Sequence, residues 1–154
     1  MPIRCEIITQ ERLLFDEQVD LVIAPASAGE MTILPQHAPV VAQLDFGELV
    51  VRTGDTEEYF AIGGGVLQVA NDHILVLADS AEQADEIDIS RAEEARQRAQ
   101  QIMEEGVPGD AADYAALQAS IKRANLLMKG GRRRQRTQTG AMRTAQFSDR
   151  SEDE

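Results

Sequence analysis

The sequence predicts an N-terminal antiparallel β-sandwich of about eight to ten strands, followed by a C-terminal antiparallel αα-hairpin and a disordered tail. Over residues 1–84, apolar residues recur at every second position in short stretches that turn formers interrupt, which is typical of strands. Beyond Asp79 the apolar spacing becomes helical, and turn formers almost disappear for about 20 residues. We therefore divide the chain into a sandwich (1–84), a hairpin (85–129) and a charged tail (130–154).

The predicted strands are short, and most of them end at a recognisable turn signal. Pro35, Gly47 and Asn71-Asp72 each follow one strand, and Gly63-Gly64-Gly65 follows another. No helix-length segment separates consecutive strands, so an antiparallel sandwich or barrel is favoured over a parallel α/β sheet. In chain order the predicted strands cover residues 3–7, 19–23, 31–34, 40–44, 49–52, 59–62, 66–69 and 73–78.

Two amphipathic helices are predicted after the strands. The first covers residues 88–105, with Asp88 as one of two possible N-caps. The second covers residues 110–129, begins at the N-cap Asp110 and ends at Gly130-Gly131. Because only a short break containing Gly and Pro joins them, the two helices form an antiparallel αα-hairpin.

Alanine is prominent in the apolar stripes of both predicted helices. Small Ala side chains let two helices approach closely but bury little area, and apolar burial contributes only about 25 cal/mol per Å2. A lone hairpin of this composition is marginally stable, so it must dock on the sandwich or on a partner. Two docking positions of similar free energy would make the hairpin a movable element.

Composition excludes several classes of protein. No apolar run approaches the ~18 to 20 residues that span a bilayer, and the start lacks the apolar region of a secretory signal. The single cysteine, Cys5, cannot form an internal disulfide, and we expect it to be a small buried hydrophobe. The chain carries a net charge of −12, with 3 basic and 14 acidic groups in residues 1–84. Such an acidic body is a poor partner for nucleic acid.

The predicted tail carries a basic run of Arg132, Arg133, Arg134 and Arg136, followed by acidic residues at its end. A solvated extension is the favoured interpretation. Contact of the run with RNA, anionic lipid or an acidic partner is the alternative. A nucleic-acid module working through these arginines is the weakest hypothesis for the chain, because the charge of the body opposes it.

The material for catalysis or for a metal site is thin. His37 and His73 lie in different strand and loop contexts, and neither has a second His or Cys at a ligand spacing. Gly63-Gly64-Gly65 lacks the spacing of a phosphate-binding loop and precedes no helix, so we expect a close backbone approach at a sheet bend. An autonomous enzyme is therefore disfavoured.

One motif with ligand chemistry lies where the strands give way to the first helix. Arg91 and Arg98 are seven residues apart and share a helix face, while Asp88 stands at the helix start beside free N–H groups. Arginines can fork onto phosphates, and a carboxylate can accept from an adenine amino group or a ribose hydroxyl. The alternative is an ordinary amphipathic helix, with Arg91 paired to Glu94 or Glu86. The full candidate set is Glu82, Ile87, Asp88, Arg91, Ala92, Arg98 and Arg123.

Three segments in order, GEMTILPQHAP (29–39), FAIGGGVLQV (60–69) and LVLADSAE (75–82), resemble the epsilon subunits of F-type ATP synthases. These subunits are called delta in mitochondria. The resemblance covers residues 2–129 and includes an I-D-x-x-R-A helix start and a two-helix end. Thr32 and Gln36 replace glycines of the family pattern, which a loop absorbs where φ is not positive.

The resemblance implies a non-catalytic component of the rotor. In this family the sandwich joins the gamma subunit and sits on the ring of membrane-embedded proton-carrying subunits. The hairpin either folds against the sandwich or extends into the catalytic alpha/beta hexamer, where it blocks hydrolysis. By the same resemblance the chain is peripheral, attached through its partners to the cytoplasmic face of the bacterial plasma membrane.

The resemblance also implies roles for individual residues. Glu30 and His37 fall in the loop that resembles the contact surface for the ring and gamma. The Ile87-Asp88-x-x-Arg91-Ala92 motif resembles an ATP-binding motif of some bacterial epsilon subunits, with Glu82, Arg98 and Arg123 at matching supporting positions. Leu127 replaces a second arginine, which removes one phosphate contact. No cofactor is required, and ATP is a regulatory ligand; a free-standing ATP-sensing module is the alternative function.

Overall fold

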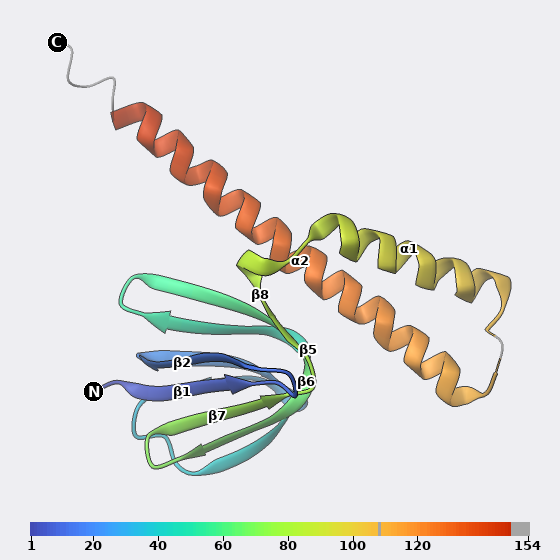
Figure 1. The fold of residues 1–154 in the computed structure, drawn as a ribbon. Coiled ribbons are helices and arrows are strands. Elements are labelled where there is room, and N and C mark those ends of the chain that lie inside the picture. Colours follow the sequence, from blue (N-terminus) through green and yellow to red (C-terminus); the bar gives the residue numbers. More distant parts are fainter. Residues whose placement is uncertain (108, 149–154) are drawn as a thin grey trace.

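The computed structural model describes residues 1–107 and 109–148, with side chains as far as Arg132. Eight strands form a sandwich at the N-terminal end, and two helices form a hairpin beside it (Figure 1). The predicted fold class, a sandwich followed by an αα-hairpin, is therefore confirmed. The strands are β1 Ile3–Ile8, β2 Leu13–Val19, β3 Leu21–Ala26, β4 Gly29–Ile33, β5 Val40–Thr53, β6 Thr56–Ala70, β7 His73–Ala78 and β8 Ala81–Gln83.

The strands pair in the order β2-β1-β7-β6-β5-β3-β4, and β8 pairs with the first half of β6. Every pairing is antiparallel except that of β1 with β7, which is parallel. These two strands are far apart in the chain. The alternation of apolar residues identifies strands but carries no information on their relative direction, so the sequence did not predict this pair.

The strands β5 and β6 are each one long element where we predicted two, so the expected breaks at Gly47 and at Gly63-Gly64-Gly65 are wrong. Pairing continues past the glycines, with Leu44 opposite Gly65. The first half of β6 pairs with β8 and its second half with β7, so β6 passes between layers at these glycines. Glycine here bends a strand instead of ending it.

The predicted close backbone approach at the glycine run is confirmed. A Cβ at Gly63 would lie 2.1 Å from Ser80 Oγ, and a Cβ at Gly65 would lie 2.2 Å from the Leu77 carbonyl oxygen. Gly65 also has a φ of +134°, which L side chains rarely adopt. The triple glycine is thus a packing feature of the bend.

The prediction for residues 19–23 is wrong in two respects. It missed β2, whose middle residues are acidic or polar and whose inner face holds only Phe15 and Val19. It also placed Leu21 and Ile23 on the buried face, whereas Val22 and Ala24 are buried. The chain bends at Asp20, the single residue between β2 and β3, and the two strands pair with different neighbours. The alternation therefore restarts in β3, and a pattern continued from β2 assigns its residues to the wrong face.

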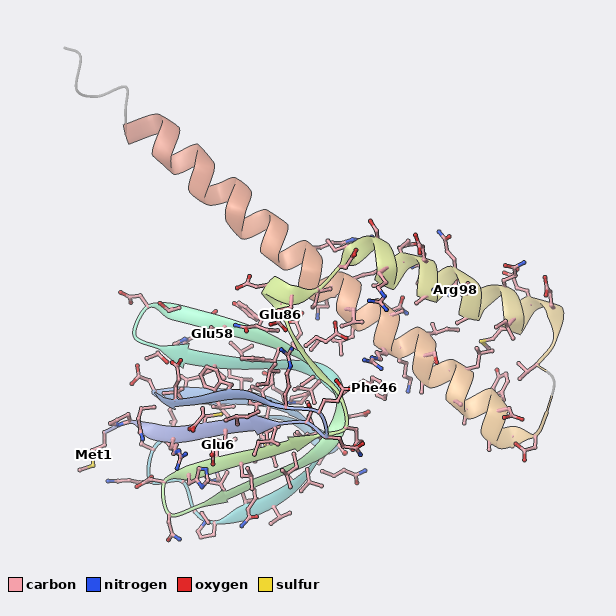
Figure 2. All side chains as sticks on the ribbon, viewed as in Figure 1. Met1, Glu6, Phe46, Glu58, Glu86 and Arg98 are labelled. Carbon is pink, nitrogen blue, oxygen red and sulfur yellow. The ribbon has the colours of Figure 1, made fainter. Side chains whose placement is uncertain are left out.

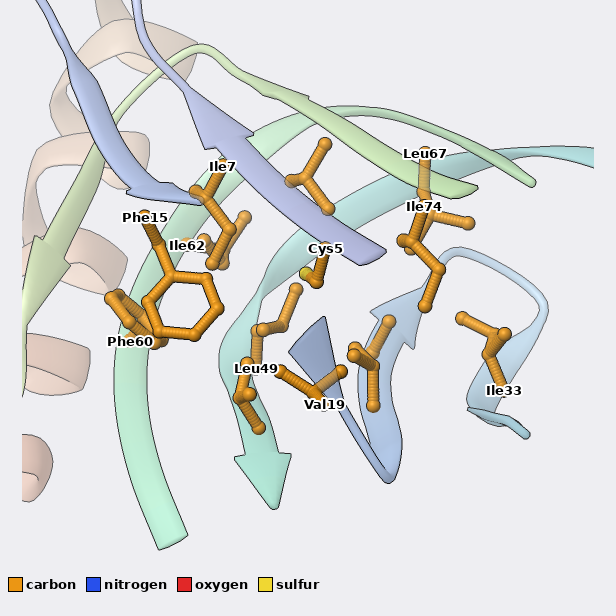
Figure 3. Close-up of a cluster of buried hydrophobic side chains, with 14 of the residues drawn as sticks. Cys5, Ile7, Phe15, Val19, Ile33, Leu49, Phe60, Ile62, Leu67 and Ile74 are labelled. Atoms are coloured by element: carbon orange, nitrogen blue, oxygen red, sulfur yellow. The ribbon is translucent and has the colours of Figure 1, made fainter. Parts of the chain in front are cut away.

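The core lies between the layers of the sandwich, where apolar side chains from both converge (Figure 3). The Phe15 and Phe60 rings meet edge to face, with centroids 5.5 Å apart and planes at 70°. Among the described residues, none that is polar or charged is buried. Aliphatic side chains such as Ile3, Leu49 and Leu67 fill most of the remaining space, which explains how a chain with 4% aromatic residues forms a core.

Cys5 is fully buried on β1, as predicted. Burial, with a smaller effect from Glu6 and Asp16, raises the pKa of its thiol from 9.0 to about 12. The native thiol therefore stays protonated, and thiol reagents should reach it only after unfolding.

This raised pKa makes stability depend on pH in the alkaline range. Below the unfolded pKa of 9.0 the thiol is neutral in both states, and above it only the unfolded chain ionises. We expect the free energy of unfolding to fall by about 1 kcal/mol between about pH 9 and pH 10 through this group. Urea titrations at both pH values should show a smaller fall for Cys5→Ala, and equal falls would contradict the prediction.

Two helices follow the short 3-10 helix η1, Ala84–Glu86. Helix α1 covers Ile89–Glu105, and Asp88 Oδ1 caps it by accepting from the Arg91 N–H at 3.1 Å. Helix α2 covers Ala111–Ser148, and Asp110 Oδ1 accepts from the N–H groups of the first turn. Of the two possible N-caps of the first helix, Asp88 is the one used, not Ser90, and the predicted N-cap Asp110 is confirmed. Of the described helices neither is long and apolar enough to cross a bilayer.

The prediction that the second helix ends at Gly130-Gly131 is wrong, because α2 continues to Ser148. Both glycines are buried, where Ile87 and Ile89 pack onto the helix backbone; a Cβ at Gly131 would lie 2.5 Å from Ile89 Cγ1. We predicted disorder over residues 130–154. For residues 130–148 this prediction is wrong, because they continue α2. Extending an existing helix needs no new nucleus. Residues 149–154 lie outside the described residues.

Candidate functional site

A groove lies where the hairpin meets the sandwich, at the root of α1 and beside the middle of α2. Figure 1 shows how β8 leads from the sandwich to the start of α1 beside α2. It consists of two adjoining hollows of about 460 and about 430 Å3. Glu82, Glu86, Arg91 and Arg123 line both hollows. The first is also lined by Asp88, Ala92, Ala95, Ser120, Ala124 and Leu127, and the second by Thr9, Gln10, Glu11, Arg12, Asp79, Ser80 and Ala81.

Local structure explains why Asp88 and Arg91 lie together in the groove. Asp88 precedes the first turn of α1, and its carboxylate accepts from the backbone N–H of Arg91. The Arg91 guanidinium pairs with neither Glu94 nor Glu86 in the part of the chain that the structure describes, contrary to the alternative drawn from the sequence. Glu86 pairs instead with Arg12, which leaves Arg91 available to a ligand.

Two ion pairs cross the groove and connect the sandwich with its neighbours. Arg12 Nη2 lies 2.6 Å from Glu86 Oε2, joining the β1–β2 turn to η1, and Arg123 Nη2 lies 3.3 Å from Glu82 Oε1, joining α2 to β8. The side chains are between 34% and 52% exposed. Exposed pairs of this kind contribute at most about 1 kcal/mol each, so an anionic ligand can displace them at small cost.

The structure brings five of the seven predicted nucleotide-binding residues to the groove and leaves two outside it. The five that line it are Glu82, Asp88, Arg91, Ala92 and Arg123. Ile87 is buried beneath it, against Gly130 and Gly131. Arg98 lies further along α1, lines neither hollow and points its Nε toward the Glu94 carbonyl oxygen at 3.4 Å (Figure 2).

Glu30 and His37, the predicted partner-contact residues, lie on β4 and in the turn after it, and neither lines the groove. The Nδ1 atom of His37 lies 2.7 Å from the Ala38 carbonyl oxygen. A residue other than glycine fits positions 32 and 36 without strain only where φ is not positive. Thr32, in β4, has no positive φ, whereas Gln36 has a φ of +62°. The Gln36 N–H donates to Asp72 Oδ1, which helps hold the turn.

The sequence-based reasoning missed Arg12 and Ser120 as groove residues. Arg12 is 74 positions from Glu86, so no local period or motif relates the two residues. The described part of the chain contains no group of three or more side chains suited to hold a metal ion. The chemistry of the groove therefore rests on guanidinium and carboxylate groups.

Comparisons with known proteins cover nearly the whole described chain. Residues 2–84 match the family "ATP synthase, Delta/Epsilon chain, beta-sandwich domain", and residues 85–129 match "ATP synthase, Delta/Epsilon chain, long alpha-helix domain". A protein named ATP synthase epsilon chain from Dehalococcoides mccartyi strain BAV1 is 45% identical over 135 residues, or 87% of this chain and 95% of the relative. The protein of that name from Herpetosiphon aurantiacus is 40% identical over 139 residues, 90% of this chain and all of the relative.

Solved structures agree with this match. A chain in the structure of the Euglena gracilis mitochondrial ATP synthase, OSCP/F1/c-ring, superposes with a TM-score of 0.68 at 25% identity, over 82% of this chain and 79% of that one. A chain of the Tetrahymena thermophila mitochondrial enzyme, central stalk and c-ring, has the same fold with a TM-score of 0.56 at 14% identity. On the two domain matches and the 45% identity over most of its length, this chain belongs to the ATP synthase delta/epsilon chain family.

Proposed function

We propose that this chain is the epsilon subunit of an F-type proton-translocating ATP synthase, a non-catalytic component of the central stalk. The observation that carries the proposal is the 45% identity, over 135 residues, to a protein named ATP synthase epsilon chain. The likeness to a chain of a solved ATP synthase supports the same assignment. In this role the chain stays peripheral, at the cytoplasmic face of a bacterial plasma membrane.

In the proposed role the sandwich attaches to the rotor. It links the gamma subunit to the ring of membrane-embedded proton-carrying subunits, and Glu30 and His37 belong to the contacting surface. A core made of tightly packed aliphatic side chains supports this role, because a part that couples proton flow to ATP synthesis must transmit torque without deforming.

The hairpin is the proposed regulatory part, which restrains ATP hydrolysis by leaving the sandwich and entering the catalytic alpha/beta hexamer. Its buried surface is small: α1 buries only Ala92 and Ala99, α2 adds Ala124 and Met128 beside its two glycines, and exposed ion pairs cross the groove. At its outer end Ile102 and Tyr114 remain 44% and 45% exposed. An apolar stripe that the sandwich does not cover can gain burial elsewhere, as a two-position element requires.

A reversible disulfide tests the regulatory role. A Cβ at residue 131 would lie 2.5 Å from Ile89 Cγ1, so Ile89→Cys with Gly131→Cys places the two Cβ atoms near the ~3.5 to 4.5 Å of a disulfide. Oxidation would hold α2 on the root of α1, a few residues after the sandwich ends, and so prevent the two helices from separating and extending into the hexamer. In a reconstituted complex we expect ATP hydrolysis to be several-fold faster with the oxidised double-cysteine variant than with the same variant after reduction.

Three outcomes separate the parts of this proposal. Equal hydrolysis rates before and after reduction would remove the inhibitory role and leave the rotor role standing. Failure of the wild-type chain to join gamma and the alpha/beta hexamer would refute the assignment as a whole. The single variants Ile89→Cys and Gly131→Cys are the matched controls, and Cys5 does not interfere because it is buried.

ATP is the proposed regulatory ligand of the groove. The observation that favours it is the convergence of Asp88 and Arg91, from the start of α1, and Arg123, from α2, on one hollow. Calorimetry on the intact chain is the test, and we expect Arg91→Ala to abolish the heat of ATP binding. Heat that survives this change would show that the ligand binds elsewhere, and Arg98→Ala tests whether Arg98 joins the site.

A further inference from the structure

Helix α2 is strongly basic beyond its first turn. Residues 114–148 contain eight basic groups and no acidic group, whereas the rest of the chain contains seven basic and 27 acidic groups. The match to the long alpha-helix domain ends at residue 129, so the family comparison does not explain the basic residues that follow. Five of the eight basic groups lie there, and they are Arg132, Arg133, Arg134, Arg136 and Arg143.

This basic segment projects from an acidic body. Arg123, earlier on α2, pairs with Glu82 at the groove. Beyond Gly131 the helix stands clear of the strands and of α1 (Figure 1), and Arg132, the first residue after the buried glycines, is exposed. With the acidic residues at its end included, the segment 130–154 contains six basic and four acidic groups, so it remains positive as a whole.

The spacing of the arginines places three of them in a row along one face of the helix. Successive residues of an α-helix are rotated by about 100°, so Arg132, Arg136 and Arg143 fall within about 40° of one another. The row extends about 16 Å along the helix axis. A straight row of cations suits a flat anionic surface, which can meet all three residues at once.

We propose that the part of α2 beyond Gly131 binds the anionic lipid headgroups of the membrane surface directly, through the row of Arg132, Arg136 and Arg143. The inference goes beyond the proposed function, in which partner subunits alone hold the chain to the membrane, and it takes from that proposal the place of the chain beside the membrane. Guanidinium groups donate hydrogen bonds to the phosphates of headgroups, and the negative potential of an anionic leaflet attracts basic segments.

The acidic body opposes this contact, and the length of the helix limits the opposition. Arg136 and Arg143 lie about 8 and about 18 Å beyond Gly131 along the axis. Exposed charges that are separated by more than the Debye length, about 8 Å at physiological salt, are largely screened from one another. The row can therefore lie against headgroups while the acidic strands stay in solution.

The composition of the segment favours lipid over nucleic acid. Proteins bind single-stranded nucleic acid with aromatic side chains that stack on the bases, in addition to basic groups. No aromatic residue lies between Arg132 and Arg143, where the other residues are mainly Gln, Thr and small residues. Headgroups need only the charge, which the segment supplies.

Flotation of the full chain with lipid vesicles tests the inference. The vesicles contain either phosphatidylcholine alone or phosphatidylcholine and phosphatidylglycerol in equal parts. We expect binding only to the anionic vesicles, and we expect high salt to abolish it. Because each basic residue near such a surface strengthens binding about fivefold, Arg136→Gln combined with Arg143→Gln should weaken it about tenfold or more.

Two other double variants are the controls. Arg52→Gln combined with Lys122→Gln removes two exposed positive charges outside the segment, and we expect vesicle affinity to change less than about twofold. Arg136→Lys combined with Arg143→Lys keeps both charges and should bind nearly as tightly as the wild type. Gln and Lys are both good helix formers, so circular dichroism should show the same helix content in every variant.

Each contrary result overturns the inference in a distinguishable way. A wild-type chain that does not bind the anionic vesicles would refute it and leave the subunit assignment, which assembly with gamma tests, unaffected. Equal weakening by the two Gln double variants would mean that overall charge decides binding, and not this segment. Binding of RNA at physiological salt without binding of vesicles would make nucleic acid the partner. Weaker association with the alpha/beta hexamer in Arg136→Gln with Arg143→Gln, again without vesicle binding, would make the partner an acidic protein surface.

Discussion

Gly65→Ala is expected to lower the free energy of unfolding by about 3 kcal/mol or more, one of the two largest effects we predict. Two costs combine at this position. The φ of +134° is strained for any residue with a side chain, and the new Cβ would lie 2.2 Å from the Leu77 carbonyl oxygen and 2.8 Å from Ala78 Cα. Both contacts are with the backbone of β7, which cannot move without breaking its pairing with β6.

Gly29→Ala is the matched control for this prediction. Gly29 has a similar φ of +128° but nothing within 4 Å of its added Cβ, so the substitution carries only the backbone strain. We expect it to cost about 1 to 2 kcal/mol, measured by urea denaturation beside Gly65→Ala. Equal losses in the two variants would show that the approach of β7 contributes nothing.

Phe60→Ala is expected to destabilise the chain by about 4 kcal/mol, the other large effect. Phe60 is the largest fully buried side chain in the described residues and meets Phe15 edge to face at 5.5 Å. Removing its ring loses the transfer free energy of the aromatic group and leaves a cavity between the layers (Figure 3).

Phe46→Ala supplies the comparison for this substitution. Phe46 lies on β5 at the bend and is only half-buried, so the same change should cost about 1 kcal/mol. Thermal and urea unfolding of both variants, followed by circular dichroism, measures the difference. A loss at Phe60 no larger than that at Phe46 would contradict the packing that we describe.

Sequence alone predicted most of the fold, and its failures have identifiable physical causes. The alternation of Ile3, Cys5 and Ile7 identified β1 because one of its faces is buried. It failed for β2, where the acidic and polar residues 16–18 interrupt the apolar pattern, and for β5 and β6, where glycine allows a bend without ending the strand. Local patterns show which residues suit a strand, whereas continuity across a bend depends on the neighbouring layer.

The helices show a similar limit. Gly130-Gly131 has the composition of a helix end, and the signal is sound for an isolated helix. Here the space that the glycines leave is occupied by Ile87 and Ile89, so contact with the segment before α1 overrides the local preference. That contact joins positions more than 40 residues apart, which no window along the sequence covers.

The sequence predicted some residues of the candidate site and missed others. Asp88 and Arg91 are joined by helix capping, a rule that works over three residues, and their proximity followed from the sequence. Arg123 required the hairpin to fold back, which the αα-hairpin prediction included. Arg12 is added only by the tertiary arrangement, since its turn reaches the groove because β1 and β7 are neighbours in the sheet.

Because α2 is one uninterrupted helix, a rotation about its buried part would move its far end by a larger distance. A helix rises about 1.5 Å per residue, so the part beyond Gly131 extends about 25 Å from the place where Ile87 and Ile89 hold it. A rotation of the hairpin by about 20° about that point would displace the end of the helix by about 9 Å. If the hairpin rotates as its proposed regulatory role requires, a distance probe at Ser148 would detect the movement most sensitively.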